Sequence, residues 1–300
     1  MVNVFAPAKI NLTLHITGQR DDGFHLLDSL VTFATVGDKL HLEKAGVFSL
    51  IVEGPEAAGV PADMDNLALR AAALVSADLK AAITLTKNLP TSSGIGGGSA
   101  DAAAAWRGML GLEGNGETFA DRHYAMPEIL LKTQLRALTR LGADVPMCIA
   151  SSPARVRGIG DRLALHPLPT LPAVLVNPRV PVSTPQVFKS MKTRENLPMP
   201  ETIPAFEAAS DLIDWLQGQR NDLQVPAIAI VPEISTVLDR LTACAGAKLV
   251  RMSGSGATCF ALFDDVEAAK AAAGALYTER PNWWVAGCML GNMSGRALPK

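Results

Sequence analysis

A glycine-rich segment between Pro90 and Asp101 is the part of this sequence best suited to bind an anion. Four glycines fall within five positions, so the backbone can approach a ligand closely and adopt positive φ angles without a steric penalty. An alanine-rich stretch that reads as a helix follows, and the free N–H groups at a helix start favour an anion. The segment therefore predicts a phosphate-binding loop. Its candidate residues are Pro90, Ser93, Gly94, Ile95, Gly96, Gly97, Gly98 and Ser99.

Two familiar phosphate-binding motifs do not describe this loop. The P-loop motif needs a lysine directly after its last glycine, where this chain has Ser99. The dinucleotide-binding fingerprint needs a third, spaced glycine at that same position. A flexible loop with Ser99 as the helix N-cap is the simpler alternative. A second glycine-rich segment, from Ser253 to Gly256, lies between two expected strands and reads equally as a hairpin turn or as part of a site.

The polar residues near the N-terminus are the first candidates for catalytic or binding roles beside such a loop. Lys9, Asn11 and Thr13 alternate with Ile10 and Leu12, so they occupy the opposite face of an expected strand. A polar strand face is either exposed to solvent or lines a cleft. The strand alone does not decide between these interpretations.

Further candidates also have two interpretations each. Asp144 follows a Gly-Ala turn and could cap a helix or accept a proton from a substrate hydroxyl. Asn66 stands at an expected helix start, where it could be an N-cap or contact a nucleotide base. Phe24 and Phe188 could be core residues, or two faces that stack on a flat ring system.

Bulk composition excludes several classes of function. The chain has 300 residues, of which 48% are hydrophobic and 19% charged, as expected for a globular protein. A formal net charge of -2 argues against binding nucleic acid through a broad basic face. The sequence contains no apolar run of roughly 20 residues and begins without a signal-peptide pattern, so we expect no membrane association and a cytoplasmic location. Scattered cysteines and histidines predict no structural metal site.

Hydrophobic periodicity predicts an α+β protein. A first strand through Ile10 and Ile16 should continue into a hairpin at 18–23. Further strands are expected at 29–35, 39–43, 48–53, 82–87, 248–252, 258–263 and 283–289. Helices are expected at 65–79, 100–110, from Pro127 to about 141, and at 210–217, 232–242 and 266–276. Frequent prolines between 167 and 185 predict a crossing between two lobes and a substrate loop.

Three segments together resemble the GHMP kinase superfamily, which includes galactokinase, homoserine kinase and mevalonate kinase. They are residues 7–12, 90–101 and 253–256, in the order and at the approximate spacing of that superfamily. The resemblance implies a two-lobed GHMP kinase fold. Residues 1–158 would form a ribosomal-protein-S5-like lobe with the ATP loop, and residues 159–300 a ferredoxin-like α/β sandwich that contributes to acceptor binding. It also implies ATP-dependent phosphorylation of an alcohol, with Mg²⁺ accompanying ATP.

Four segments resemble one branch of the superfamily more closely. Residues 17–25, 94–101, 141–146 and 185–189 are similar to kinases that phosphorylate the 2-hydroxyl of 4-diphosphocytidyl-2-C-methyl-D-erythritol, in non-mevalonate isoprenoid biosynthesis. This closer resemblance implies an acceptor that is a cytidine diphosphate derivative. Phe24 and Phe188 would then sandwich the cytosine, with His25 and Lys189 beside it.

The resemblance also implies roles for the polar residues. Lys9 would assist phosphoryl transfer and Asp144 would accept the hydroxyl proton, which makes these two the predicted catalytic residues. Asn11 and Gly254 would contact the acceptor. Asn66 would contact the adenine of ATP.

The metal is the least specified component. Ser99 is the one hydroxyl in the loop that we assign as a candidate Mg²⁺ ligand. Asp101 is expected to interact with the dipole of the following helix rather than with the metal.

Two alternatives to this function stay open at the level of sequence. One is a GHMP kinase for homoserine, mevalonate or a sugar, and the other is a nucleotide-binding regulator without catalysis. A monomer and a homodimer are equally compatible with the sequence.

Overall fold

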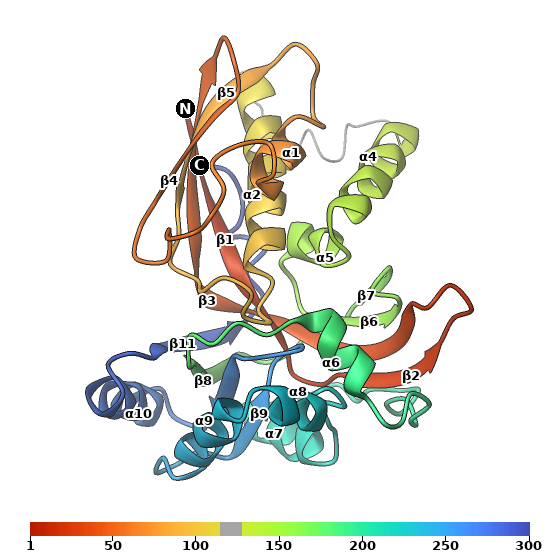
Figure 1. Ribbon diagram of the computed structural model, residues 1–300, viewed down its shortest axis with the longest axis vertical. Coiled ribbons are helices and arrows are strands. Elements are labelled where there is room, and N and C mark those ends of the chain that lie inside the picture. The colour runs from red at the N-terminus through yellow and green to blue at the C-terminus, as the bar shows by residue number, and fades with distance from the viewer. Residues whose placement is uncertain (115–127) are drawn as a thin grey trace.

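The computed structural model describes residues 1–114 and 128–300, which form two lobes connected through one β-sheet (Figure 1). Within these residues the sheet has eleven strands, ordered β4-β5-β3-β11-β8-β10-β9, while β1, β2 and β6 also pair with β3 and β7 pairs with β6. β4 and β5 are parallel and the other pairs are antiparallel. The strands are β1 Val2–Asn11, β2 His15–Gln19, β3 His25–Ala45, β4 Ser49–Glu53, β5 Lys80–Thr86, β6 Ala154–Gly158, β7 Arg162–Leu165, β8 Leu171–Asn177, β9 Leu249–Met252, β10 Cys259–Leu262 and β11 Trp284–Gly291.

The long strand β3 connects the lobes. Its first residues pair with β2 and β6, and its last residues pair with β5. The sequence predicted two separate strands at 29–35 and 39–43, which is wrong because Gly37 continues the pairing, opposite Pro7. A Cβ atom at Gly37 would lie 2.2 Å from the carbonyl oxygen of Ala6, so glycine is required there for the close approach of β1 rather than for a turn.

Helices cover both lobes (Figure 1). They are α1 Leu67–Ala72, α2 Gly97–Glu113, α4 Glu128–Leu141, α5 Val145–Ala150, α6 Thr184–Ser190, α7 Ala209–Gln217, α8 Gln224–Ile230, α9 Glu233–Thr242 and α10 Val266–Glu279. The helix expected at 65–79 is shorter than predicted, because the Ser76 hydroxyl accepts hydrogen bonds from the backbone of Asp78 and Leu79 and stabilises a turn. Pro127, the predicted first residue of α4, lies outside the described residues. No helix in the described ranges is both long and apolar enough to span a membrane.

The proline-rich segment contains a strand that the sequence analysis missed. All seven residues of β8 are buried, and the strand lies between β10 and β11 at the centre of the C-terminal lobe. Its proline, Pro172, is the second residue of the strand, and its carbonyl oxygen accepts a hydrogen bond from the Phe263 N–H at 2.9 Å. The frequent prolines therefore obscured a central strand in the sequence pattern. Only part of the segment 167–185 forms an irregular crossing between the lobes.

The two lobes share packing as well as the sheet. One hydrophobic cluster joins Ile10 of β1 and Leu30 of β3 to Leu175 of β8 and Phe260 of β10. The chain termini meet on the N-terminal lobe, where Asn3 and Lys300 exchange two backbone hydrogen bonds (Figure 1). The predicted division into residues 1–158 and 159–300 stays a prediction, and the C-terminal residues return to the first lobe.

Candidate active site

Strand β1 carries two polar side chains into the interior rather than into solvent. Lys9 and Asn11 are only 5% and 6% exposed. The pairing of β1 with β3 shifts register between Pro7 and Lys9, an irregularity of the kind that redirects side chains beside functional sites. The Lys9 Nζ atom donates to Asn11 Oδ1 at 2.7 Å. This polar face therefore lines a cavity, and its interpretation as a solvated face is wrong.

Asp144 reaches the same place from the other side of the cavity. It occupies the N-cap position of α5, but its side chain makes no capping hydrogen bond. Its Oδ2 atom instead lies 3.1 Å from Lys9 Nζ, and the side chain keeps 36% exposure. The carboxylate is thus paired with a buried ammonium group and is still accessible to a ligand.

The phosphate loop connects β5 to α2 and passes directly over this pair. Gly94 and Gly96 adopt left-handed φ angles of 76° and 67°. A Cβ atom at Gly96 would lie 3.3 Å from Lys9 Cε and 3.7 Å from Asp144 Oδ2, so the bare backbone of the loop contacts both side chains. The Lys9 backbone N–H donates to the carbonyl of Ile95 at 2.9 Å. The start of α2, with its free N–H groups, therefore adjoins the Lys9–Asp144 pair.

The second glycine loop packs against the first. The Thr258 N–H donates to the Ser93 carbonyl at 3.1 Å, and the Ser253 hydroxyl donates to the Gly94 carbonyl at 3.3 Å. The same hydroxyl accepts from the Asn11 N–H at 3.1 Å. Gly254 lines the cavity, and its contact with an acceptor stays a prediction. Ser253, which the sequence analysis did not single out, is the residue that joins both loops to β1.

A buried ionic cluster lies beneath the phosphate loop. Lys87 Nζ donates to a carboxylate oxygen of Asp38 and, at 2.7 Å, to Asp101 Oδ2, and all three residues are at most 3% exposed. Asp38 also accepts from the backbone N–H groups of Asn88 and Leu89, which lead into the loop. The expected role of Asp101 in the first turn of α2 is therefore wrong, because its carboxyl group points to Lys87 instead.

The pKa values of Asp101 and Lys87 are both shifted within this cluster. Burial first, and the nearby Asp38 carboxylate second, raise the pKa of Asp101 well above its usual value. Burial acts to lower the pKa of Lys87, but the carboxylates of Asp101 and Asp38 outweigh it and raise that pKa. Asp101 Oδ1 is buried and has no hydrogen-bond partner among the described residues, so the Lys87 ammonium group is the main polar contact of this carboxyl group. The cluster supports the loop from below, because Lys87 pairs with both carboxyl groups and Asp38 holds the backbone that leads into the loop.

Removing the Lys87 ammonium group should destabilise the folded protein. We expect Lys87→Met to lower the free energy of unfolding by about 3–5 kcal/mol, because two buried carboxyl groups lose their counter-ion. Chemical denaturation of the purified variant measures the loss. The matched control is Lys270→Met, which removes an exposed lysine paired with Glu267 and should cost less than about 1 kcal/mol. A loss below about 1 kcal/mol for Lys87→Met would contradict the proposed support.

Aromatic residues form the opposite end of the cavity. The His25 and Phe188 rings stack with centroids 4.6 Å apart and planes inclined by 22°. Phe24 is 59% exposed in the turn before β3, and it lines the cavity together with Lys189. The family resemblance predicted that Phe24 and Phe188 form a slot for a base. The structure places the His25 ring against Phe188 instead, since β3 begins at His25 and holds its ring against α6.

The His25 ring is suited to read a polar edge. Partial burial, and next the guanidinium group of Arg194, lower its pKa, so the ring is neutral at neutral pH and has one donor and one acceptor nitrogen. Its Nε2 atom has no hydrogen-bond partner among the described residues. Arg194 also lines the cavity, and the sequence analysis missed it because no motif surrounds it.

Asn66 is a helix N-cap and also lines the cavity. Its side-chain oxygen accepts from the Ala68 N–H at 2.9 Å, which makes it the N-cap of α1. Its side-chain nitrogen donates to the carbonyl of Pro61 at 2.7 Å. Asn66 also lines the cavity, so contact with a nucleotide base stays a prediction.

One cavity brings nearly all of the predicted residues together. It has a volume of about 1340 Å³ and extends from Asn66 and the phosphate loop, past Lys9 and Asp144, to Phe188. Single-ligand pockets usually measure roughly 300–1,000 Å³, so this cavity can hold two nucleotide-sized ligands end to end. The Lys9–Asp144 pair lines this cavity beside Gly96 of the phosphate loop. Ile95, although in the loop, is fully buried and supports it from the core.

Comparison with known proteins agrees with this geometry. Residues 66–151 match the model of the GHMP kinase N-terminal domain, and residues 202–281 match that of the GHMP kinase C-terminal region. The chain is 52% identical to the 4-diphosphocytidyl-2-C-methyl-D-erythritol kinase of Roseobacter denitrificans, covering 100% of this chain and 97% of that protein. It is also 52% identical to the kinase of the same name from Ruegeria pomeroyi, covering 95% and 98%. A crystal structure of 4-(cytidine 5'-diphospho)-2C-methyl-D-erythritol kinase superposes with a TM-score of 0.72 at 32% identity, covering 96% and 99%.

Proposed function

The chain belongs to the 4-diphosphocytidyl-2-C-methyl-D-erythritol kinases of the GHMP kinase family, and from this membership we propose how its own residues carry out the reaction. The γ-phosphoryl group of ATP is transferred to the 2-hydroxyl of 4-diphosphocytidyl-2-C-methyl-D-erythritol. A P–O bond forms at the acceptor oxygen, and the bond between the γ-phosphorus and the bridging oxygen of ADP breaks.

Asp144 takes the proton that the acceptor hydroxyl loses. A carboxylate is too weak a base to deprotonate an alcohol before attack, but a loose phosphoryl-transfer transition state needs chiefly orientation and late proton acceptance. The exposed part of Asp144 orients the hydroxyl towards the phosphate loop. Lys9, 3.1 Å from Asp144, holds the carboxylate in place and offsets the charge on the transferred phosphoryl group.

The phosphate loop holds the ATP phosphates through the backbone from Ser93 to Ser99. The Ser99 hydroxyl lines the cavity at this loop, and no group of three or more His, Cys, Asp or Glu among the described residues is placed to hold a metal. This donor set fits a Mg²⁺ that ATP brings with its own phosphate and water ligands. Ser99 would complete its coordination, and the metal would neutralise phosphate charge.

The aromatic end of the cavity binds the cytidyl group. Phe188 and the neutral His25 ring offer a stacking face and a polar edge, and Phe24 is free to cover the base from the turn. Asn11 lines the cavity and is held in place by Lys9 and by Ser29, to which its Nδ2 atom donates at 2.8 Å. Homoserine, mevalonate and sugars have no base to occupy such a pocket.

The Lys9–Asp144 pair beneath the phosphate loop is the observation that carries this proposal. An assay of ADP release with ATP and Mg²⁺ tests it, comparing the cytidyl acceptor with homoserine, mevalonate and galactose. We expect turnover with the cytidyl compound alone. Turnover with another alcohol would preserve the catalytic pair and refute the base pocket. ATP binding without turnover on any acceptor would favour the regulator.

The base pocket makes a separate prediction. We expect Phe188→Ala to raise the KM for the cytidyl acceptor by about tenfold or more, because stacking on an aromatic ring contributes about 1–3 kcal/mol per base. The kcat and the KM for ATP should change little. The matched control is Phe206→Ala, which removes a ring that contacts His166 away from the cavity. An unchanged acceptor KM would remove Phe188 from the pocket.

A further inference from the structure

An irregular segment after α6 fastens the acceptor side of the cavity to the sheet. This segment, residues 191–201, is here called the strap, and it contains neither helix nor strand. The backbone N–H and the side-chain nitrogen of Asn196 both donate to the Ile16 carbonyl at 3.0 Å. Arg194 donates to Gln19 at 3.0 Å. The strap is therefore tied to the β2–β3 hairpin along its length.

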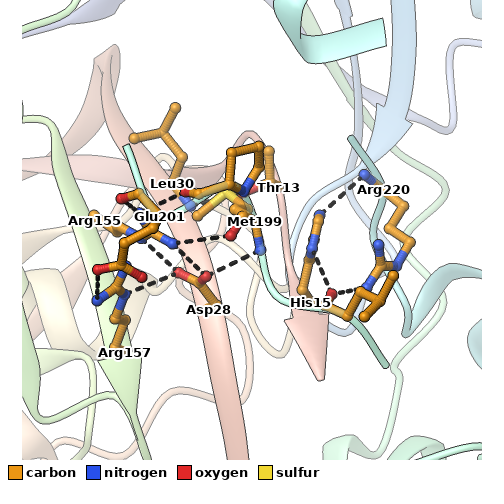
Figure 2. Close-up of polar contacts among 11 residues, drawn as sticks. Thr13, His15, Asp28, Leu30, Arg155, Arg157, Met199, Glu201 and Arg220 are labelled. Atoms are coloured by element: carbon orange, nitrogen blue, oxygen red, sulfur yellow. Dashed lines mark hydrogen bonds and ion pairs between the residues drawn. The ribbon is translucent and has the colours of Figure 1, made fainter. Parts of the chain in front are cut away.

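The histidine at the start of β2 adds a further tie (Figure 2). His15 Nδ1 donates to the Leu197 carbonyl at 3.2 Å, while its Nε2 accepts from the Arg220 N–H at 3.3 Å. The Arg220 side chain also donates to the Leu197 carbonyl. These bonds hold the middle of the strap at the edge of the C-terminal lobe.

The firmest attachment is a buried ion pair between Asp28 of β3 and Arg155 of β6 (Figure 2). Arg155 donates through Nε and Nη2 to the two carboxylate oxygens, at 2.8 Å and 2.6 Å. Asp28 also accepts from the Met199 N–H at 3.1 Å, and Arg155 donates to the carbonyls of Pro200 and Glu201 at 2.9 Å and 2.6 Å. The two side chains thus bind the strap backbone as a unit.

This anchor lies on the opposite side of the sheet from the cavity. Leu27, Ser29 and Val156 line the cavity, and they are the immediate chain neighbours of Asp28 and Arg155. Successive residues of a strand point to opposite faces, so Asp28 and Arg155 point away from the ligands. Neither residue is among those that line the cavity. Their contact with the acceptor side of the cavity therefore runs through the strap backbone that they hold.

The strap joins the two elements that carry the stacked rings. Phe188 lies on α6, which ends at Ser190 immediately before the strap. His25 begins β3, three positions before Asp28 in the same strand. α6 has only seven residues, so the strap restrains its C-terminal end directly. The two stacked rings therefore belong to elements that Asp28 and Arg155 hold together through the strap.

We propose that Asp28 and Arg155 are positioning residues for the acceptor, which act by fixing the strap and thereby setting α6 against the β2–β3 hairpin. The inference rests on the proposed function, because its main readout is acceptor binding. It predicts that weakening the anchor moves Phe188 relative to His25 and leaves the Lys9–Asp144 pair and the phosphate loop in place.

Steady-state kinetics of Asp28→Asn test the inference. We expect the acceptor KM to rise about tenfold, while kcat and the KM for ATP stay within about twofold, because a small displacement of a binding group is costly. The effect should largely disappear when Asp28→Asn is made in the Phe188→Ala background, since the anchor acts through that ring. An unchanged acceptor KM, or an equal increase in both backgrounds, would overturn the inference.

Two control variants separate positioning from general loss of stability. Glu267→Gln removes an exposed ion pair with Lys270 on α10 and leaves the strap and its anchor intact, so its kinetics should match those of the parent protein. Arg107→Lys weakens another buried arginine, whose hydrogen bonds go to carbonyls far from the strap. It should lower stability without the selective rise in acceptor KM. A similar KM rise in Arg107→Lys would contradict the inference.

A milder variant and a readout without turnover complete the test. If Asp28→Asn does not fold, Asn196→Ala should give a smaller, equally Phe188-dependent rise in acceptor KM, and its absence would overturn the inference. Hydrogen exchange should accelerate over α6 in the anchor variant but not over α8. A parent protein that shows no turnover on the cytidyl acceptor refutes the proposed function, whereas unchanged exchange over α6 refutes the anchor.

Discussion

Replacing Asp144 by asparagine is expected to lower kcat by about two to four orders of magnitude, the usual contribution of a positioned proton acceptor. The amide preserves the size of the side chain and can still accept a hydrogen bond from Lys9, but it cannot take the proton of the acceptor hydroxyl. ATP affinity should change by less than about twofold, because the phosphate loop holds the nucleotide through backbone groups. Steady-state kinetics and direct titration with ATP measure the two quantities.

The C-terminal lobe offers a matched control for this substitution. Asp264 also pairs with a lysine, Lys248, at 2.9 Å, but on the surface and outside the cavity. Asp264→Asn should leave kcat unchanged. A kcat near the parent value in Asp144→Asn would show that another group accepts the proton.

Replacing Gly94 by alanine is expected to weaken ATP binding by about tenfold to a hundredfold. The residue has a φ of 76°, and its Cβ atom would lie 2.7 Å from the carbonyl oxygens of both Ser253 and Gly256. Strain of about 1–3 kcal/mol must be relieved by moving the two loops apart, and each 1.4 kcal/mol corresponds to about tenfold in affinity. Titration with ATP measures the effect.

Substitution of a second glycine distinguishes the effect of the steric clash from the effect of a positive φ angle. Gly59 has a φ of 75°, but no atom would lie within 4 Å of its Cβ. Gly59→Ala should therefore carry the conformational strain without the collision, and ATP affinity should change little. Equal effects of the two substitutions would mean that contact between the loops does not shape the phosphate site.

Local sequence patterns predicted much of the secondary structure correctly. The phosphate loop lies between a strand and a helix as expected, and α7, α9, α10, β9, β10 and β11 lie close to their predicted ranges. These features follow from short-range causes, namely glycine φ freedom, alternation along strands and apolar periodicity along helices. The predicted family is confirmed as well, because its motifs are short segments that can be read without coordinates.

Patterns failed where a local signal had more than one structural cause. Two strands were predicted at 29–35 and 39–43, but Gly37 between them continues β3 and allows the close approach of β1. Prolines marked β8 as irregular, although the strand is buried at the centre of a lobe. Phe24 and Phe188 predicted two stacking faces, and only the structure shows that the His25 ring stacks on Phe188. In each case, a contact with residues distant in the sequence decides which interpretation of the local pattern is correct.

Sequence patterns were sufficient to identify the type of loop, the classes of the elements and the candidates Lys9 and Asp144. The folded structure was needed to show that these two side chains meet, that Asp101 turns to Lys87, and that Asp28 and Arg155 hold the strap. The difference follows from the range of the interactions. Backbone propensities act within a few residues, while ion pairs and buried hydrogen bonds join residues that become neighbours only once the sheet has formed.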